Sequence, residues 1–168
     1  DGKNLVEGKH VGAHGAEYRK REVFWVRLPN LDKLLKYYLD KANAECGWNF
    51  DITCNEAVQV AKYGIGGKYD WHTDGGQCHL AAKQMEDKNS GRIDRTNNPN
   101  HIGTVRKLSM VAQLSDPSEY EGGEVQFGIQ DKHTKEWYTM NQLKGSLTIF
   151  PTFLSHNVTP VTKGTRYV

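Results

Sequence analysis

The sequence predicts a mainly β fold, an antiparallel barrel or sandwich with one early helix as a buttress. Three observations carry this prediction: many short β-type runs divided by turn residues, one helical pattern near the N-terminus, and no βαβ alternation. A hydrophobic content of 37%, with eight tyrosines and four tryptophans, fits a folded chain rather than a disordered one. The 168 residues are expected to form one domain, in which residues 1–48 contribute an arm, a strand and a helix and residues 49–168 the core.

The N-terminal part is expected to contain one strand and then the helix. Residues 1–21 are rich in Gly and Lys without periodicity and are interpreted as an arm or loop. Residues 22–28 are a β-type run closed by Pro29, after which Asn30 or Asp32 could cap a helix ending near Gly47. Apolar residues at the 3-4 spacing of an amphipathic helix support this element: Leu31, Leu34, Leu35, Tyr38, Leu39 and Ala42.

The rest of the chain alternates β-type runs with turns. Apolar residues between 50 and 63 suggest one or two strands, interrupted around 55–56. Further strands are expected at 106–115, 125–129, 137–140 and 145–150, with a turn at 121–124 and a final pair, 158–161 and 165–168, around Lys163-Gly164. The polar segment 83–103 is predicted to be a loop, either a lid or binding loop or a mobile insertion.

Charge and cysteine content limit the function classes. The net charge of +2 gives no electrostatic case for binding nucleic acid or a membrane surface. No apolar run approaches the roughly 18 residues that a membrane span needs. The odd number of cysteines (Cys46, Cys54 and Cys78) fits a reducing compartment, so a cytoplasmic location is expected.

The stretch 63–74 carries two candidate metal ligands. His72 and Asp74 are two residues apart in an expected strand, so their side chains should project from one face. An imidazole and a carboxylate on one face are two of the three ligands of a facial-triad iron site, which leaves three coordination positions open. His156, at the end of the run 150–156, supplies the third. Each residue alone would more simply be a strand histidine or a turn-forming aspartate; the set favours the metal site.

Arg166 is the candidate anion-binding residue. A guanidinium is always charged and can bind a carboxylate through two parallel hydrogen bonds. On a strand paired with the one that carries His156, Arg166 could reach the far carboxylate of 2-oxoglutarate while the near end of that acid chelates iron. The alternative for this residue is an ordinary surface arginine.

Four motifs occur in order along the chain: Tyr63-Gly-x-Gly-Gly-x-Tyr69-x-x-His72-x-Asp74, Glu121-Gly-Gly-Glu-Val-Gln-Phe127, Lys144-Gly-Ser-Leu-Thr-Ile-Phe-Pro151, and Ser155-His156-Asn-Val-Thr-Pro160 continuing to Arg166-Tyr. This set resembles the iron(II)/2-oxoglutarate-dependent dioxygenase superfamily. Within it, the chain is most similar to the prolyl-4-hydroxylase-like branch, particularly the bacterial and phage PKHD-type hydroxylases. The resemblance covers roughly residues 50–168 and implies a double-stranded β-helix (jelly roll) core over 49–168, with the N-terminal helix packed on the outside.

The resemblance also implies roles for the site residues. Fe(II) would be held by His72, Asp74 and His156, and 2-oxoglutarate would form a salt bridge with Arg166. Tyr63 matches a tyrosine that hydrogen-bonds the co-substrate in relatives. The strand that carries Gln113 is one on which some relatives place a tyrosine at the 2-oxoglutarate site. Dioxygen would be the second co-substrate, and ascorbate is a further candidate cofactor. Halogenating relatives need an open position where Asp74 stands, so hydroxylation is favoured.

The activity expected from the resemblance is hydroxylation of an unactivated carbon, in a prolyl or other residue of a peptide or protein, coupled to decarboxylation of 2-oxoglutarate to succinate. A small-molecule substrate is an alternative. An oxidative demethylase of nucleic acid is a second hypothesis, suggested by the basic residues Lys88, Arg92, Arg95, Arg106 and Lys107, but opposed by the modest net charge and the lack of a base-stacking platform. A third is a non-catalytic, cupin-like metal-binding module, which would not need Arg166 to face the metal.

Overall fold

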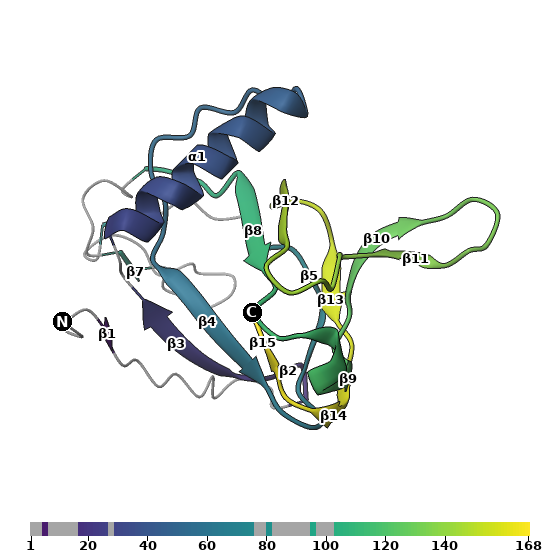
Figure 1. The fold of residues 1–168 in the computed structure, drawn as a ribbon. Coiled ribbons are helices and arrows are strands. Elements are labelled where there is room, and N and C mark those ends of the chain that lie inside the picture. Colours follow the sequence, from purple (N-terminus) through teal and green to yellow (C-terminus); the bar gives the residue numbers. More distant parts are fainter. Residues whose placement is uncertain (1–4, 7–16, 27–28, 76–79, 82–94, 97–102) are drawn as a thin grey trace.

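The computed structural model describes residues 5–6, 17–26, 29–75, 80–81, 95–96 and 103–168 (Figure 1). Within these ranges there is one α-helix, α1 (Pro29–Glu45), and one 3-10 helix, η2 (Pro117–Glu119). The strands are β1 (Leu5–Val6), β2 (Arg19–Lys20), β3 (Glu22–Val26), β4 (Val58–Tyr63), β5 (Lys68–His72), β6 (Leu80–Ala81), β7 (Arg95–Thr96), β8 (Leu108–Ala112), β9 (Tyr120–Gly122), β10 (Val125–Gln130), β11 (Trp137–Thr139), β12 (Leu147–Pro151), β13 (His156–Val158), β14 (Val161–Gly164) and β15 (Arg166–Tyr167).

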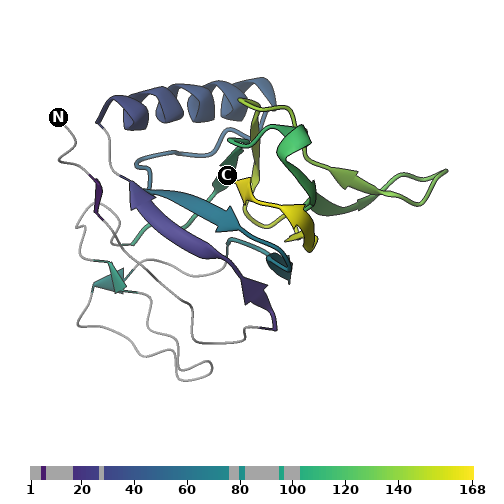
Figure 2. The ribbon, with the colours of Figure 1, turned by 60° about the horizontal axis from the view of Figure 1, so that its bottom comes forward.

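Two sheets contain most of the strands and enclose the core. One has the order β1-β3-β4-β15 and the other β11-β10-β13-β5-β2, while β12-β8 and β14-β9 form separate antiparallel pairs. The buried core cluster takes side chains from both sheets and from these pairs: Ala61, Tyr63, Val125, Phe127, Met140, Phe150, Val158 and Val161. With α1 lying along the outside of the strands (Figures 1 and 2), this is the predicted mainly β jelly roll with an external helix.

The helix has a less buried apolar stripe than its spacing predicts. It begins at Pro29, so Asn30 and Asp32 lie inside its first turn and do not cap it. Leu34 is 52% exposed and Tyr38 is 41% exposed, whereas the remaining apolar positions of the stripe are half-buried. The amphipathic helix is therefore confirmed, with two positions of its apolar stripe exposed.

The strand expected around residues 50–54 is absent, because the backbone of Phe50 is satisfied by a helix side chain. Asn43 donates from its Nδ2 to the Phe50 carbonyl at 2.8 Å and accepts the Phe50 N–H on its Oδ1 at 2.9 Å. These bonds take the place of a strand partner, and the chain stays irregular until Val58. They also tie the C-terminal part of α1 to the segment that leads into β4.

Two strand pairings differ from the prediction. Arg19–Lys20, within the segment interpreted as an arm, is strand β2 and pairs with β5. The last two strands do not pair with one another: β14 pairs with β9, and β15 pairs with β4. Gly164, with a φ of +71°, ends β14 and lets the chain turn from one partner to the other.

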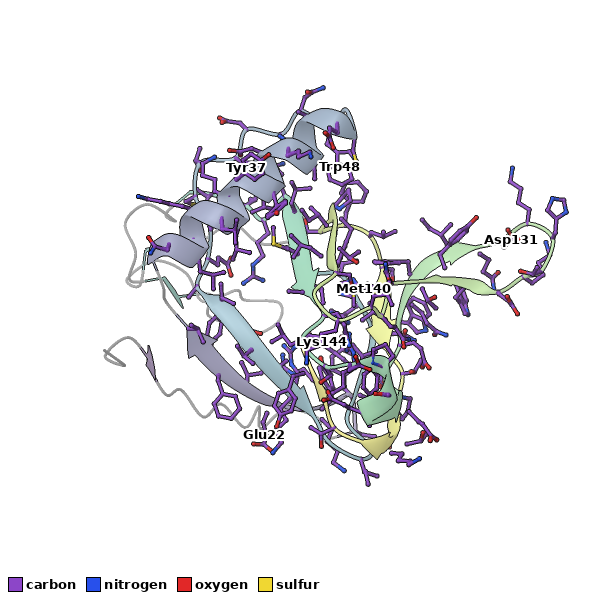
Figure 3. All side chains as sticks on the ribbon, viewed as in Figure 1. Glu22, Tyr37, Trp48, Asp131, Met140 and Lys144 are labelled. Carbon is purple, nitrogen blue, oxygen red and sulfur yellow. The ribbon has the colours of Figure 1, made fainter. Side chains whose placement is uncertain are left out.

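The other predicted strands are confirmed as β3, β8, β10, β11 and β12, and the predicted turn at 121–124 is confined to Gly123-Glu124, because β9 extends to Gly122. Strands β10 and β11 form a hairpin that projects from the body, with Asp131 near its tip (Figure 3). Asp131 closes that turn by accepting the N–H groups of His133 and Thr134. Apart from 95–96 and Gly103, the loop expected at 83–103 lies outside the described residues.

No helix in the described part of the chain is long and apolar enough to cross a lipid bilayer.

Gly164→Ala is expected to destabilise the fold strongly, because a Cβ there would lie 2.0 Å from the Glu119 carbonyl oxygen, in a conformation with positive φ. We expect a loss of about 3 kcal/mol or more in the free energy of unfolding, from left-handed strain and overpacking together. Gly145→Ala is the matched control, since Gly145 also has a positive φ but open space around its Cβ position. It should cost only about 1–2 kcal/mol. Urea unfolding followed by tryptophan fluorescence measures both, and equal losses would contradict the steric argument.

Candidate metal centre

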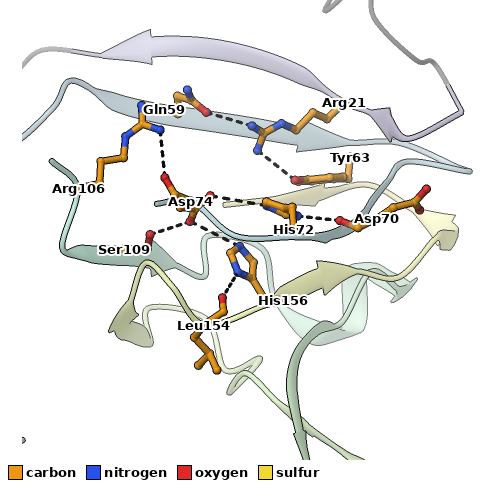
Figure 4. Close-up of polar contacts among 10 residues, drawn as sticks. All are labelled: Arg21, Gln59, Tyr63, Asp70, His72, Asp74, Arg106, Ser109, Leu154 and His156. Atoms are coloured by element: carbon orange, nitrogen blue, oxygen red, sulfur yellow. Dashed lines mark hydrogen bonds and ion pairs between the residues drawn. The ribbon is translucent and has the colours of Figure 1, made fainter. Parts of the chain in front are cut away.

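Three potential metal ligands converge where β5 and β13 meet (Figure 4). His72 ends β5 and is the cross-strand partner of His156, which begins β13. Asp74 lies between the two rings: its Oδ1 is 3.6 Å from Nε2 of His72 and its Oδ2 is 3.5 Å from Nε2 of His156. One ligand atom from each residue lies within 4.8 Å of the others. Two ligand atoms that lie about 2.1 Å from the same ion and at right angles to one another are about 3 Å apart. The three ligand atoms would therefore need to move only slightly closer together to bind one metal ion.

Both imidazoles are held in the orientation that a metal ligand needs. The Nδ1–H of His72 donates to the Asp70 carbonyl at 2.7 Å, and the Nδ1–H of His156 donates to the Leu154 carbonyl at 3.0 Å. These bonds fix the tautomer in which Nε2 carries a free lone pair, and both Nε2 atoms face Asp74. Burial lowers the pKa of His72 below its ordinary value of 6.5, and the neighbouring His156 acts in the same direction. His72 is therefore neutral at pH 7, as metal binding requires.

Asp74 lies in a bend beyond the end of β5, not within the strand as the spacing suggested. Its position is set from the neighbouring pair β12-β8. The N–H groups of Asp74 and Gly75 donate to the Thr152 carbonyl at 3.0 and 3.1 Å. Ser109 on β8 donates from its hydroxyl to Asp74 Oδ2 at 2.7 Å, and Arg106 donates to the Asp74 carbonyl at 3.3 Å. The carboxylate therefore faces the two histidines without belonging to their sheet ladder.

Aromatic rings cover the outer sides of the two histidines. The ring of Tyr69 stacks on His72, with centroids 3.5 Å apart and planes 14° apart. Phe150 meets His156 edge-on at 4.9 Å, and Phe127 lies 6.5 Å away from the same ring. Two imidazoles and one carboxylate in such surroundings form a donor set that suits a first-row divalent metal such as iron.

Arg166 is a buried cation with unused donors. Arg166 is 1% exposed, and its Nη2 donates to Oε1 of Gln113 at 3.0 Å. Nε and Nη1 are buried and have no hydrogen-bond partner. Burial lowers the pKa of Arg166 from its ordinary value, yet a guanidinium stays charged at neutral pH. Buried charged donors are normally satisfied, so these nitrogen atoms are suited to binding an anion such as a carboxylate.

Gln113 is fully engaged with protein groups. It is 0% exposed, and its Nε2 donates to the Ser115 carbonyl at 3.1 Å and to the Tyr120 hydroxyl at 2.8 Å, while Oε1 accepts from Arg166. Both amide hydrogens are thereby used. Gln113 thus fixes the guanidinium of Arg166 in the core.

Arg166 lies on the last strand, as predicted, but that strand has a different partner than predicted. Its strand β15 pairs with β4, where Tyr63 is its cross-strand partner, and not with β13. Tyr63 is 1% exposed and ends β4, directly before the glycine turn to β5. A Cβ at Gly67 in that turn would lie 2.6 Å from the Gly64 carbonyl oxygen and 3.1 Å from atoms of Tyr63, so the tight turn requires glycine there.

The sequence brought out His72, Asp74, His156, Tyr63, Gln113 and Arg166, and the structure gathers them into two groups, the histidines with Asp74 and the remaining three around Arg166. The sequence analysis did not identify Ser109 or Thr152 as site residues. For Ser109, the available signal was a serine within the apolar run of β8. In the basic segment 88–107, Arg106 pairs with Glu56 and Lys107 lies over the Phe50 ring, while Lys88 and Arg92 lie outside the described residues.

The chain is similar in sequence to known proteins. The sequence model of the 2OG-Fe(II) oxygenase superfamily matches residues 58–168. A PKHD-type hydroxylase of Klebsiella pneumoniae subsp. pneumoniae is 28% identical over 165 residues, which are 96% of this chain and 63% of that protein. The PKHD-type hydroxylase PiuC of Pseudomonas aeruginosa is 33% identical over 172 residues, covering 96% of this chain and 64% of that protein. The chain thus spans less than two thirds of the length of either relative.

Solved structures share the fold at low sequence identity. The viral collagen prolyl hydroxylase of Paramecium Bursaria Chlorella virus-1, solved as a 2OG complex, aligns with a TM-score of 0.57 and 22% identity over 89% of this chain and 76% of that one. The prolyl hydroxylase of Trichoplax adhaerens, solved with a peptide fragment of hypoxia inducible factor, aligns with a TM-score of 0.61 and 16% identity over 98% of this chain and 68% of that one. These likenesses establish the jelly-roll fold.

Asp74→Ala is expected to weaken Mn(II) binding by about a hundredfold or more, since it removes a ligand itself, whereas loss of a ligand's outer partner costs about 10- to 100-fold. Ser109→Ala removes only the hydroxyl bonded to Asp74 and should weaken binding by about tenfold. Calorimetric titration with Mn(II) measures both dissociation constants.

His133→Ala is the control for these variants, because His133 is exposed in the β10–β11 turn and should leave the Mn(II) dissociation constant unchanged. Wild-type affinity for Mn(II) in Asp74→Ala would show that Asp74 is not a metal ligand.

Proposed function

The chain belongs to the 2OG-Fe(II) oxygenase superfamily, and from this premise we propose that it is an Fe(II)/2-oxoglutarate-dependent dioxygenase. Its reaction hydroxylates an unactivated carbon, in a prolyl or other residue of a peptide or protein, while 2-oxoglutarate is decarboxylated to succinate. Dioxygen is the other co-substrate. The observation that carries the proposal is the buried guanidinium of Arg166, with two nitrogen atoms left without partners, in the same core as a His-Asp-His cluster.

His72, Asp74 and His156 hold the ferrous ion in this proposal. When bound, the ion supplies the redox chemistry with dioxygen and the open coordination positions for the 2-oxo acid. The chain's own part is to keep both Nε2 atoms aimed inward through the carbonyls of Asp70 and Leu154. Ser109 fixes one oxygen of Asp74, which limits how the carboxylate can rotate. Phe127, Phe150 and Tyr69 keep the ligand rings in a largely apolar environment.

Arg166 binds the carboxylate of 2-oxoglutarate that lies away from the metal. Its unused Nε and Nη1 are charged N–H donors, and each can donate to a carboxylate oxygen. Gln113 orients the guanidinium through its bond to Nη2 and is a positioning residue rather than a direct ligand. Tyr63, the cross-strand partner of Arg166, donates a hydrogen bond from its hydroxyl group to the same co-substrate.

A peptide or protein substrate is supported by the names of the relatives and neighbours. The curated relatives are PKHD-type hydroxylases, and the Trichoplax neighbour was solved with a peptide fragment. A nucleic-acid substrate has less support. Of the basic residues that suggested it, Arg106 is paired with Glu56 and Lys107 lies over an aromatic ring.

The substrate class can be tested by succinate release in the presence of Fe(II), ascorbate and 2-oxoglutarate, with pools of peptides, free amino acids and methylated oligonucleotides. We expect proline-containing peptides to stimulate succinate formation above the uncoupled rate, with a mass increase of one oxygen in the peptide. Stimulation by methylated oligonucleotides alone would replace hydroxylation of peptides by demethylation. A complete lack of succinate in every pool would favour the non-catalytic, metal-binding module.

Arg166→Lys is expected to raise the KM for 2-oxoglutarate by about 10- to 100-fold while changing kcat at saturating co-substrate much less. The lysine keeps the charge but loses the planar set of guanidinium donors, and hydrogen bonds to charged groups contribute about 1.5–3 kcal/mol each. Initial rates of succinate formation at varied 2-oxoglutarate give both constants. Lys163→Ala removes an exposed cation three residues away, paired with Glu121, and should leave KM unchanged. An unchanged KM in Arg166→Lys would show that the anion binds elsewhere.

A further inference from the structure

Arg21 connects the N-terminal strands to the site residues (Figure 4). It lies between β2 and β3, and its Nη1 donates to the Tyr63 hydroxyl oxygen at 3.2 Å. Its Nη2 donates to Oε1 of Gln59 at 3.2 Å, and its guanidinium lies 5.1 Å from the centroid of the Tyr69 ring, which stacks on His72. Arg21 precedes residues 58–168, the part of the chain that the family model matches.

Among the described residues, the charge of Arg21 has no acidic counterpart. The side chain is half-buried, its Nε is buried without a hydrogen-bond partner, and it forms no ion pair with any residue that the structure describes. A partly desolvated cation without an anion is unfavourable for folding. Three contacts nevertheless hold this one beside the metal centre, which points to a functional reason for its position.

The bond to Tyr63 determines what the phenol can do. A phenol oxygen can accept hydrogen bonds and donate its single proton. Because Arg21 has only donors, Tyr63 is the acceptor in their bond, and its own proton remains available. Tyr63 is 1% exposed, and among the described residues its hydroxyl proton has no acceptor. A buried, unused O–H beside a cation is a donor prepared for an anion.

We propose that Arg21 is a positioning residue for 2-oxoglutarate that acts through Tyr63. By donating to the phenol oxygen, Arg21 turns the Tyr63 proton toward a carboxylate of the co-substrate and strengthens it as a donor. The inference rests on the proposed function, since it takes 2-oxoglutarate as the anion. It extends the co-substrate site from the core strands to a residue of the N-terminal segment.

Two other roles for Arg21 predict different behaviour. If Arg21 touched the anion directly, its removal would weaken binding whether or not Tyr63 had a hydroxyl group. If it only braced β3 against β4 through Gln59, its removal would lower stability and leave the affinity for 2-oxoglutarate unchanged.

A double-mutant cycle tests the proposal by a binding measurement that does not depend on turnover. The dissociation constant of 2-oxoglutarate is measured by calorimetry, in Mn(II)-loaded protein without dioxygen, for wild type, Arg21→Gln, Tyr63→Phe and the double variant. We expect each single substitution to weaken binding by about tenfold. The double variant should bind about as weakly as Tyr63→Phe alone, because the arginine acts only through the hydroxyl group.

Arg19→Gln is the matched control, since Arg19 lies 5.3 Å over the same Tyr69 ring but has no bond to Tyr63. It should leave the dissociation constant of 2-oxoglutarate within about twofold of the wild-type value. That change in binding free energy is smaller than the coupling energy expected between residues in contact. The Mn(II) dissociation constant should be the same in all variants. If Arg21→Gln does not fold, Arg21→Lys replaces it in both backgrounds, and any loss of affinity that it causes must disappear with Tyr63→Phe.

Additive losses in the double variant, or wild-type affinity in Arg21→Gln, would overturn this inference while leaving the proposed function intact. Wild-type protein that binds Mn(II) but not 2-oxoglutarate would overturn the proposed function and the inference with it.

Discussion

The register between β5 and β13 is the constraint on which the site depends. His72 and His156 are directly opposite one another, so their rings point to the same face of the five-stranded sheet, 4.2 Å apart. A slip of one residue in either strand would turn one histidine to the opposite face and end the convergence. The core residue Val158 lies on β13, and Phe127 lies on the neighbouring strand β10. The packing of the hydrophobic core therefore fixes this register.

A second cross-strand pair positions the candidate anion-binding residues in the other sheet. Tyr63 and Arg166 are opposite one another in β4 and β15, and both are almost completely buried. The two histidines thus come from one sheet, and Tyr63 and Arg166 come from the other. Because both sheets contribute to one core cluster, the distance between these two pairs is set by the packing of the sheets.

The supporting contacts show two ways of holding a side chain. Each histidine is fixed locally, by a carbonyl two residues earlier in the chain. Asp74, Arg166 and Tyr63 are fixed by residues far away in sequence: Ser109 on β8, Gln113 after β8, and Arg21 before β3. The local device costs little folding entropy, whereas the long-range contacts form only when the barrel closes.

Local sequence was enough to indicate the helix that begins at Pro29, most strand positions, the two-residue spacing of His72 and Asp74, and the apolar run before His156. Each of these follows from local periodicity and from backbone preferences that act over a few residues. It also determined, through the motif set, which side chains to expect at the site. The rule of two-residue spacing was right in outcome but not in cause, because Asp74 lies beyond β5 and is held by Thr152.

Which strands are neighbours could be seen only in the folded chain. The tertiary structure paired β15 with β4 rather than with β13, made a strand of Arg19–Lys20, and left residues 50–54 irregular because Asn43 satisfies Phe50. Strand partners are chosen by burial and by hydrogen bonding between segments that can be more than a hundred residues apart, as Tyr63 and Arg166 are. No local pattern contains that information, and for the same reason Ser109 and Arg21 became visible only when the chain was folded.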